Sequence, residues 1–308
     1  MKHLIGFLGL LLLPLSGNAA LVCTLNNNPI LDFGSPDPFV GGNITTTAAL
    51  NWSCTENSGK KFTGELCFFV AADSQGDIDP RHLENGGPQP LPFNVYRDAT
   101  HTTVIQPTTD AAGVAIDIPK SGPYTVSGTV TLYGMLQPLL SDVQTGMHQT
   151  VMTNSQIHFK AGNSGKGCDS AKGGPEALYT LTAQVNIPNQ CQVTATDLDF
   201  GTQATPLLQT DSQSNITVRC TNTTLFSVGL NGGLSGNREL TSGSNTVAYE
   251  LYQDTGRTTV WNNTSGRQSG TGLGTTAAIQ LMVFGRIFAD PAAAEGVYTD
   301  TITVDVTF

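Results

Sequence analysis

The chain has 308 residues, of which 12% are charged, and 24 Asp and Glu against 14 Lys and Arg give a net charge of −10. Such an acidic chain is not expected to bind nucleic acid, because it offers no basic stripe to neutralise a row of phosphates. A helical bundle is also disfavoured, since 34 Gly and 16 Pro interrupt every stretch of the sequence. The length allows two domains, each with a core of its own.

The first 20 residues have the features of a secretory signal. Lys2 precedes an apolar run from Leu4 to Leu15, and the small residues Ala19 and Ala20 follow. The run is too short to span a bilayer. We therefore expect residues 1–20 to be a signal peptide and the rest of the chain to be exported.

Six cysteines follow the signal. An even number in an exported chain predicts disulfides, and neither a C-x-x-C pair nor a histidine cluster points to a metal site. We expect no cofactor and no metal. The cysteines are Cys23, Cys54, Cys67, Cys168, Cys191 and Cys220.

An internal repeat organises these cysteines. Cys23, Asp32-Phe33-Gly34 and Cys54 recur as Cys191, Asp199-Phe200-Gly201 and Cys220, and Arg81, Tyr96 and Gly146 have collinear counterparts in Arg238, Tyr252 and Gly296. The repeat predicts homologous domains over residues 21–160 and 188–308, joined by a segment over 161–187. It also predicts the pairs Cys23–Cys54 and Cys191–Cys220, which leaves Cys67 to pair with Cys168.

Each half is predicted to be all-β. Short runs that alternate apolar and polar residues recur between Gly, Pro and Asn clusters, and no segment keeps a helical period. This pattern suits two tandem immunoglobulin-like β-sandwiches. The clearest expected strands are 124–132, 150–159, 215–220, 246–252, 277–284 and 301–308.

Two strands stand out because each lacks an obvious neighbour. In the last one, an apolar stripe is formed by Ile302, Val304, Val306 and Phe308. Such an edge would be an aggregation template unless something covers it, so we expect it to accept a further strand; the alternative is that the sheet simply ends there. Between the two domains, an equally regular stripe is formed by Tyr179, Leu181, Ala183, Val185 and Ile187. This segment could add to the open edge of domain 1, or it could be the first strand of domain 2.

Three stretches of the chain together resemble a known family. The Cys before Asp-Phe-Gly, the stretch with Tyr252, Asp254 and Trp261, and the ending from Gly296 to Phe308 resemble the spore coat protein U domain family. That family includes subunits of archaic chaperone–usher pili. The resemblance covers nearly all of the chain after the signal, once per half, and is stronger in the second half. It implies pilin-type, incomplete immunoglobulin-like domains that are capped by a periplasmic chaperone and then by a strand of the adjacent pilin subunit.

The resemblance and the chain ends together predict a position in a fibre. Only two or three residues precede Cys23 after the expected cleavage, so domain 1 has no strand to donate, whereas domain 2 has an edge that can accept one. We therefore expect a two-domain tip adhesin that is exported through the periplasm to a fimbrium by way of an outer-membrane usher. It would mediate attachment to an abiotic or host surface, or biofilm formation. The alternatives are a secreted coat or matrix protein and a soluble carbohydrate-binding module.

Loops rich in proline and apolar residues are the candidates for attachment in domain 1. If they were exposed together, they would form an apolar adhesive patch; the alternative is that they fold back onto the core. The residues in question are Phe39, Leu91, Phe93, Leu136, Leu139 and Leu140. We expect no catalytic residue, because the four histidines after the signal lie in no known catalytic motif. A carbohydrate-binding module would instead need exposed aromatic residues, for which the candidates are Trp52, Tyr96 and Tyr133.

Overall fold

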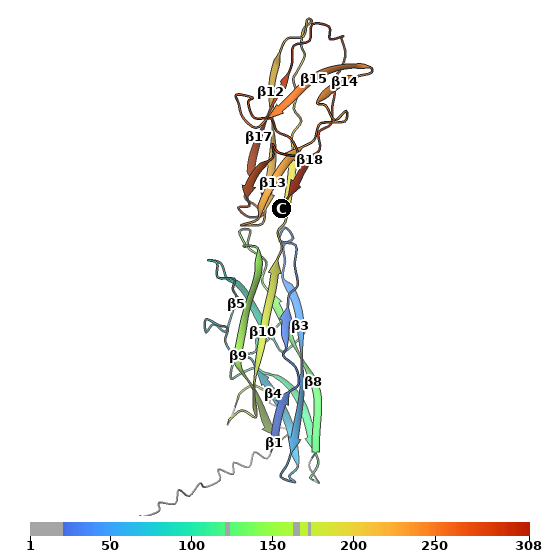
Figure 1. Cartoon of the computed structure of the whole chain (residues 1–308). Helices are drawn as coiled ribbons and strands as arrows, with labels where there is room; N and C mark the ends of the chain where they lie inside the picture. The colour runs from blue at the N-terminus through green and yellow to red at the C-terminus, as the bar shows by residue number, and fades with distance from the viewer. Residues whose placement is uncertain (1–20, 121–123, 163–166, 172–173) are drawn as a thin grey trace, which may run out of the picture.

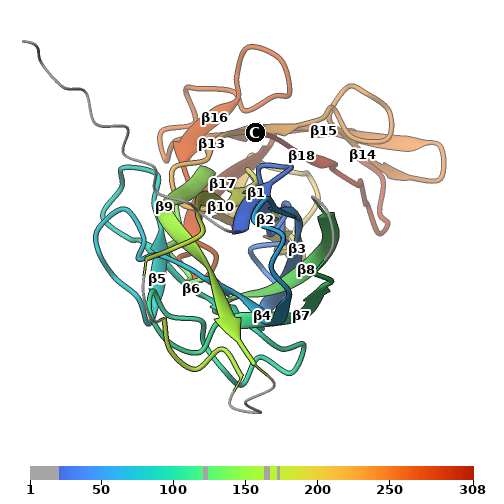
Figure 2. The same cartoon turned by 90° about the horizontal axis from the view of Figure 1, so that it is seen from below.

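The computed structural model describes residues 21–120, 124–162, 167–171 and 174–308, so the expected signal peptide lies outside the described residues. Within these ranges all regular elements are strands. They form two elongated domains placed end to end (Figure 1), and a view along the long axis has domain 1 in front of domain 2 (Figure 2). In the described ranges, no helix is long and apolar enough to cross a membrane.

The described residues of domain 1 form ten strands in two five-stranded sheets, with the orders β1-β3-β8-β6-β5 and β2-β10-β9-β4-β7. Period-two alternation places one face of each sheet on a single core. The strands are β1 (Leu21–Leu25), β2 (Ile30–Asp32), β3 (Ile44–Glu56), β4 (Phe62–Phe69), β5 (Arg81–Leu83), β6 (Leu91–Tyr96), β7 (Ala112–Ile118), β8 (Tyr124–Leu136), β9 (Gly146–Ala161) and β10 (Ala177–Ile187).

Domain 2 repeats this arrangement with fewer strands. One sheet has the order β11-β12-β17-β15-β14, and the other has three strands in the order β16-β13-β18. The strands are β11 (Cys191–Ala195), β12 (Thr210–Cys220), β13 (Leu225–Leu230), β14 (Glu239–Ser242), β15 (Asn245–Tyr252), β16 (Gln268–Thr271), β17 (Ile279–Ile287) and β18 (Val304–Thr307). The all-β fold expected from the alternating pattern is confirmed.

The repeated arginine has the same role in both domains. Arg81 is buried and donates hydrogen bonds to the carbonyls of Val70 and Ile105, at 3.0 and 2.9 Å. Arg238 donates in the same way to the carbonyls of Leu230 and Trp261, at 3.1 and 2.8 Å. Each arginine thus satisfies backbone oxygens at the end of a core strand. These contacts align β4 with β13 residue by residue.

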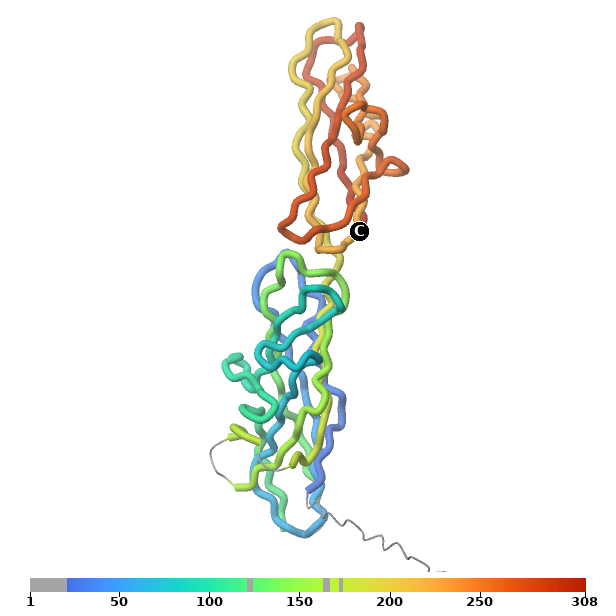
Figure 3. Tube along the Cα trace, turned by 90° about the vertical axis from the view of Figure 1, so that its left-hand side faces the viewer, coloured from blue at the N-terminus to red at the C-terminus, as the bar shows by residue number. Residues whose placement is uncertain are grey.

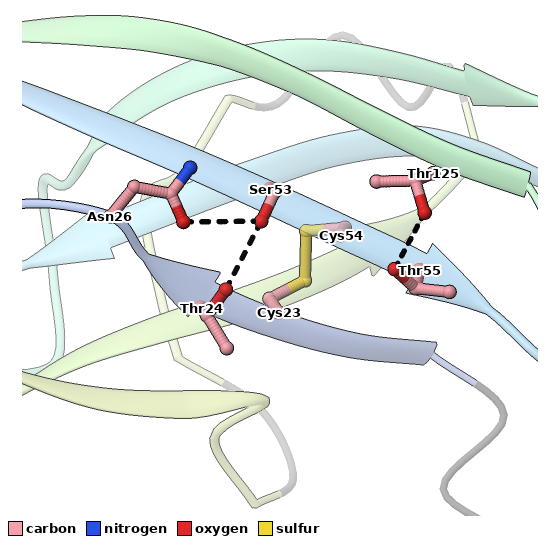
Figure 4. Close-up of a disulfide and its surroundings, with 7 residues drawn as sticks. All are labelled: Cys23, Thr24, Asn26, Ser53, Cys54, Thr55 and Thr125. Carbon is pink, nitrogen blue, oxygen red and sulfur yellow. Dashed lines mark hydrogen bonds between the residues drawn. A yellow bond between two sulfur atoms is a disulfide. The ribbon is translucent and has the colours of Figure 1, made fainter.

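Two of the three disulfides join directly paired strands. Cys23–Cys54 links β1 to β3 and Cys191–Cys220 links β11 to β12. Around the first, the hydroxyls of Thr24 and Ser53 are 3.1 Å apart on the outer face (Figure 4). The third, Cys67–Cys168, ties β4 to the connection between β9 and β10.

Direct contacts join the two domains. The amide of Thr275 donates to the carbonyl of Ser141 at 2.6 Å, and that of Thr145 donates to the carbonyl of Asn222 at 3.2 Å. The side-chain amide of Asn222 also donates to the carbonyl of Asp142 at 2.9 Å. The connection between β8 and β9 therefore contacts domain 2 directly, and this end of domain 1 is called the joint below (Figure 3).

Candidate functional site: an open groove in domain 2

The last strand of domain 1 shows what a completed sandwich looks like in this chain. β10 lies between β9, to which it is antiparallel, and β2, to which it is parallel. The five residues of its apolar stripe, Tyr179, Leu181, Ala183, Val185 and Ile187, are all at most 6% exposed. Segment 177–187 therefore completes the second sheet of domain 1, rather than beginning domain 2.

The corresponding place in domain 2 is open. One edge of β18 pairs with β13, and no described residue pairs with its other edge. Beside that free edge lies a groove of about 280 Å³ that reaches the core. In domain 1 the same place is filled by β10. We call this feature the domain 2 groove and define it by its two walls and its floor.

One wall consists of Ile302 and Val304 from the end of the chain, and the other consists of Leu198 and Phe200. All four are half-buried, whereas Leu31, the domain 1 counterpart of Leu198, is 0% exposed beneath β10. The floor is formed by buried residues of the three strands β13, β15 and β17, namely Leu230, Leu251 and Val283. The groove is thus apolar, and part of each wall residue lacks a packing partner.

Local sequence explains how the Leu198 wall is held. The carboxylate of Asp199 accepts a hydrogen bond from the amide of Gly201 at 2.7 Å, which closes the turn after the wall. Gly285 on β17 lets the wall approach closely, because a Cβ atom there would lie only 2.8 Å from Leu198 Cδ1 and 2.9 Å from Phe200 Cζ. The repeated Asp-Phe-Gly triplet is therefore a packing motif rather than a reactive one.

A polar contact lies at one end of the domain 2 groove. The Tyr249 hydroxyl donates to Asp300 Oδ2 at 2.6 Å, and Asp300 Oδ1 accepts from the amide of Leu234 at 2.8 Å. Burial and the Asp300 carboxylate raise the pKa of Tyr249 well above its usual value, so the tyrosine stays protonated and remains a donor. These bonds fix the chain immediately before the Ile302 wall. Their role is to position this wall of the groove.

The outer face of β18 is held by an arginine. Arg267 Nη1 lies 2.7 Å from Asp305 Oδ2, and Arg267 Nη2 donates to the carbonyl of Ser227 at 2.9 Å. Side chains therefore alternate along β18, with Asp305 outward and Val304 and Val306 packed against the core. β18 keeps regular pairing over Val304–Thr307 only, less than the expected 301–308. Phe308 is 56% exposed and lies outside the core cluster.

The proposed apolar adhesive patch does not form. Leu91, Phe93 and Leu136 are 1%, 0% and 0% exposed, so the prediction that they are displayed on loops is wrong. They belong to β6 and β8, whose inner faces form the domain 1 core. Leu139 also packs against that core, and Phe39 is half-buried. Only Leu140 is exposed, at 49%.

The aromatic residues considered for carbohydrate binding are not exposed platforms. Trp52 and Tyr96 are 4% and 7% exposed, and Tyr133 is half-buried. The rings of Tyr96 and Tyr133 both make edge contacts with His101. Trp52, Tyr96 and Tyr133 therefore have packing roles in the first sheet of domain 1.

One group of side chains near β5 has the composition of a metal site. Asp73, Asp77 and His82 could offer three ligand atoms within 4.8 Å. However, the buried Asp73 carboxylate already accepts hydrogen bonds from the amides of Gln75, Asp77 and His82, at 2.9, 2.8 and 2.8 Å. Its oxygens hold the turn in place, and the group is best explained as a structural loop.

Sequence reasoning identified the Ile302 edge and the β10 stripe but missed the second wall and the polar end of the groove. The repeated Asp-Phe-Gly triplet and the pair Tyr298 and Asp300 were visible signals. The sequence did not show that these residues share one groove. Leu198 and Tyr249 lie 104 and 53 residues away from Ile302 in the sequence and come near it only in the fold.

Comparisons with known proteins show the family of the chain and a solved structure with a similar fold. The model of the Spore Coat Protein U domain matches residues 12–154 and 177–305. Over 93% of its length the chain is similar in fold to 100% of a chain in the CsuC–CsuE chaperone–tip adhesion subunit pre-assembly complex from archaic chaperone–usher Csu pili of Acinetobacter baumannii, with 18% identity and a TM-score of 0.54.

Two further solved structures are more distant. A chain of a chaperone–tip adhesin complex from CFA/I fimbriae biogenesis matches 92% of this chain with 97% of its own length, at 11% identity and a TM-score of 0.29. The CooA pilin subunit from enterotoxigenic Escherichia coli matches 55% of this chain with 99% of its own length, at 11% identity and a TM-score of 0.27. A search of the curated proteins found no significant match.

Proposed function

Because the chain belongs to the Spore Coat Protein U domain family and carries the domain once in each half, we propose that it is a non-catalytic subunit of a chaperone–usher surface fibre. In this proposal the domain 2 groove receives a strand from another polypeptide. A periplasmic chaperone occupies the groove first, and the adjacent pilin subunit replaces it at the outer-membrane usher. The chain is then displayed on the cell surface.

The observation that carries this proposal is the position of β10. The second family match begins at Ala177, the first residue of β10, so this strand belongs by sequence to the second copy of the domain. In the fold, however, it completes the sheet of the first copy. One copy of the domain thus lends its leading strand to its neighbour, which is β-strand addition within a single chain. The open groove of domain 2 has the shape of the same acceptor before it is filled.

β10 also predicts how a strand should lie in the domain 2 groove. In the alignment of β4 with β13, Phe68 is equivalent to Val228. Ile157 pairs with Phe68 and Val306 pairs with Val228, so Ile157 and Val306 are equivalent too. Met152 is then equivalent to Ile302, with one extra residue in β9 where Asn154 has a φ of 63°. Since Leu181 lies opposite Met152, we expect a large apolar side chain opposite Ile302.

One position along the incoming strand should be small. Ala183 lies opposite Thr150, the counterpart of Asp300. Asp300 is already hydrogen-bonded to Tyr249 at the end of the groove, so a large side chain there would have to displace a part-buried polar contact. We therefore expect alanine, glycine or serine at this position of the donor.

The tip position is the finer part of the proposal. Its support is that β10 already completes the second sheet of domain 1. Of the two domains, only domain 2 therefore has an open groove for an incoming strand. The similarity in fold to a chain of a chaperone–tip adhesion subunit complex extends over nearly the whole of both chains. Immunogold labelling of fibres tests it: label at the ends alone supports a tip subunit, and label along the shaft contradicts it.

The acceptor function is tested by giving domain 2 a strand of its own. The full chain is extended after Phe308 by a flexible linker of about four residues and a second copy of residues 177–187. In the matched control, the residues that copy Leu181 and Val185 are asparagine. We expect the apolar extension to raise the melting temperature of domain 2 and the control to leave it unchanged. Equal melting temperatures for the two extensions would refute an acceptor role for the groove.

A further inference from the structure

The lysines of this chain are not spread over its surface. After residue 20 there are six, at positions 60, 61, 120, 160, 166 and 172, and all precede domain 2. Four of them are in the described part of the structure. Three of these, Lys60, Lys61 and Lys120, are exposed, and Lys160 is half-buried. The half that follows residue 187 contains no lysine.

Strand pairing brings the described lysines to one end of domain 1. Lys61 precedes Phe62, the first residue of β4, which lies opposite Ile118 at the end of β7, and Lys120 follows two residues later. The end of β9 reaches the same place, because Ala161 lies opposite Gly64. This is the end of domain 1 farthest from the joint (Figures 1 and 3). We call Lys60, Lys61 and Lys120 the lysine pole.

The arginines are used differently. Arg81 and Arg238 are buried on backbone carbonyls. Four others form ion pairs within the fold: Arg97 with Asp169, Arg267 with Asp305, and Arg257 and Arg286 with Asp211. Six of the seven arginines therefore hold the structure together, whereas the exposed lysines of the described residues gather where the chain turns at the free end. Such a separation has no evident structural purpose.

Nearby carboxylates neutralise the pole only in part. Glu56 is turned inward, where it accepts hydrogen bonds from the amide and hydroxyl of Ser58 and, at 3.0 Å, from the amide of Gly59. These bonds lower its pKa and commit its charge to closing the turn before Lys60. Asp117 lies 3.6 Å from Lys61, with both side chains more than half exposed, and such a pair is weak. Among described residues, Lys60 and Lys120 form no ion pair.

The surroundings of the pole indicate the chemistry of its ligand. Lysine is a hydrated point charge that does not form the bidentate contacts of arginine, so a group of lysines suits a polymer with distributed charge rather than one enclosed anion. Tyr124 lies beside the pole, opposite Glu56, and is 41% exposed. Next to it the hydroxyls of Thr55 and Thr125 are 2.8 Å apart on the outer face (Figure 4). Exposed ring, hydroxyls and ammonium groups together match an acidic sugar polymer.

We propose that the lysine pole is a binding surface for acidic polysaccharides, that is, chains carrying carboxylate or sulfate groups. The negative charge of the rest of the molecule favours binding at this end. Because the whole chain is acidic, a polyanion is repelled by the body of the protein and attracted only at this end. Binding at the free end of domain 1 goes beyond the proposed function and does not depend on the domain 2 groove being filled.

The test measures binding of the full exported chain to immobilised alginate and dextran sulfate, with neutral dextran as the matched polymer. We expect binding to both charged polymers and none to dextran, with affinity falling as salt rises. Changing Lys60, Lys61 and Lys120 together to Gln should weaken binding by about tenfold or more, and changing all three to Arg should retain it. All three side chains are exposed, so the melting temperature should not change.

Three results would overturn the proposal. The first is unchanged binding by the triple Gln variant, and the second is equal binding to neutral dextran. The third is tighter binding to phosphatidylglycerol vesicles or duplex DNA than to either charged polysaccharide, which would assign the pole to another anion. The outcome is separate from that of the strand-extension experiment, because the latter reports the melting temperature of domain 2 alone.

Discussion

Met152 and Ile302 occupy equivalent positions, one under a completed sheet and one beside the open groove, so their truncation measures the difference between the two states. Met152 is 0% exposed and lies opposite Leu181 of β10. Ile302 is half-buried. Truncating a fully buried Met to Ala costs about 2–5 kcal/mol. In the free protein Ile302→Ala should cost less, about 1–2 kcal/mol, because part of the side chain has no packing partner to lose.

The remaining cost should appear when a donor strand arrives. Once a strand covers Ile302, its truncation should resemble that of Met152, so about 1–3 kcal/mol of donor binding is lost. At about 1.4 kcal/mol for each tenfold change in affinity, the dissociation constant of a donor peptide should rise by roughly 5-fold to 100-fold. A peptide with the sequence of residues 177–187 serves as the donor, because this chain already uses it.

The chain offers separate reporters for the two domains. Trp52 is 4% exposed in domain 1 and Trp261 is 0% exposed in domain 2. In a Trp52→Phe background the fluorescence of Trp261 follows domain 2 alone through denaturant unfolding and peptide titration. The reasoning is refuted if Ile302→Ala destabilises free domain 2 as much as Met152→Ala destabilises domain 1. It is equally refuted if Ile302→Ala leaves the peptide affinity unchanged.

Three further predictions follow from the same structure. Gly285→Val should weaken donor binding, since a Cβ there would lie 2.8 Å from a side chain of the groove wall; unchanged peptide affinity would contradict this. Asp98 accepts hydrogen bonds from Thr100 and from other residues of its loop, and these bonds hold its pKa below the usual 3.8. The charged form of Asp98 therefore stabilises domain 1 above pH 3.8. This contribution is lost as the pH falls through the lower pKa of the folded state. Asp98→Asn should therefore lower the melting temperature at pH 7 but not in strongly acidic solution, and an equal loss at both would refute the assignment. Replacing Cys67 and Cys168 by Ala should cost domain 1 about 2–5 kcal/mol in chemical denaturation and leave the domain 2 transition in place; a shift of both transitions would show that the domains unfold together.

Regular alternation made the strands near residues 177–187 and 301–308 predictable from the sequence. Each has an apolar residue at every second position, and such a pattern identifies a strand with one buried face wherever it occurs. The pattern does not indicate which sheet the strand joins, so segment 177–187 could be assigned either to domain 1 or to domain 2. The answer came from pairing with β9 and β2, whose partner residues are 20 to 152 residues away.

Short strands with unbroken burial explain the error in the loops. β6 has the sequence LPFNVY and buries four consecutive residues from Phe93 to Tyr96. A run of this kind, with a proline at its second position, does not alternate and resembles a connection between strands. The lysine pole was missed for a related reason: its members come from separate connections, and only the pairing of β4 with β7 brings them together.

If the proposed function is right, the junction between the two domains is a template for the junction with the next subunit. β10 ends at Ile187, opposite Gly146 at the joint, and β11 begins four residues later at Cys191. A donor strand antiparallel to β18 would start near the C-terminus, which lies close to domain 1 (Figure 1), and run toward the free end of domain 2. Its own domain would then follow there, beyond the far end. If the register of β10 holds at this second junction, successive domains stack in one direction, and the lysine pole stays at the end farthest from the shaft.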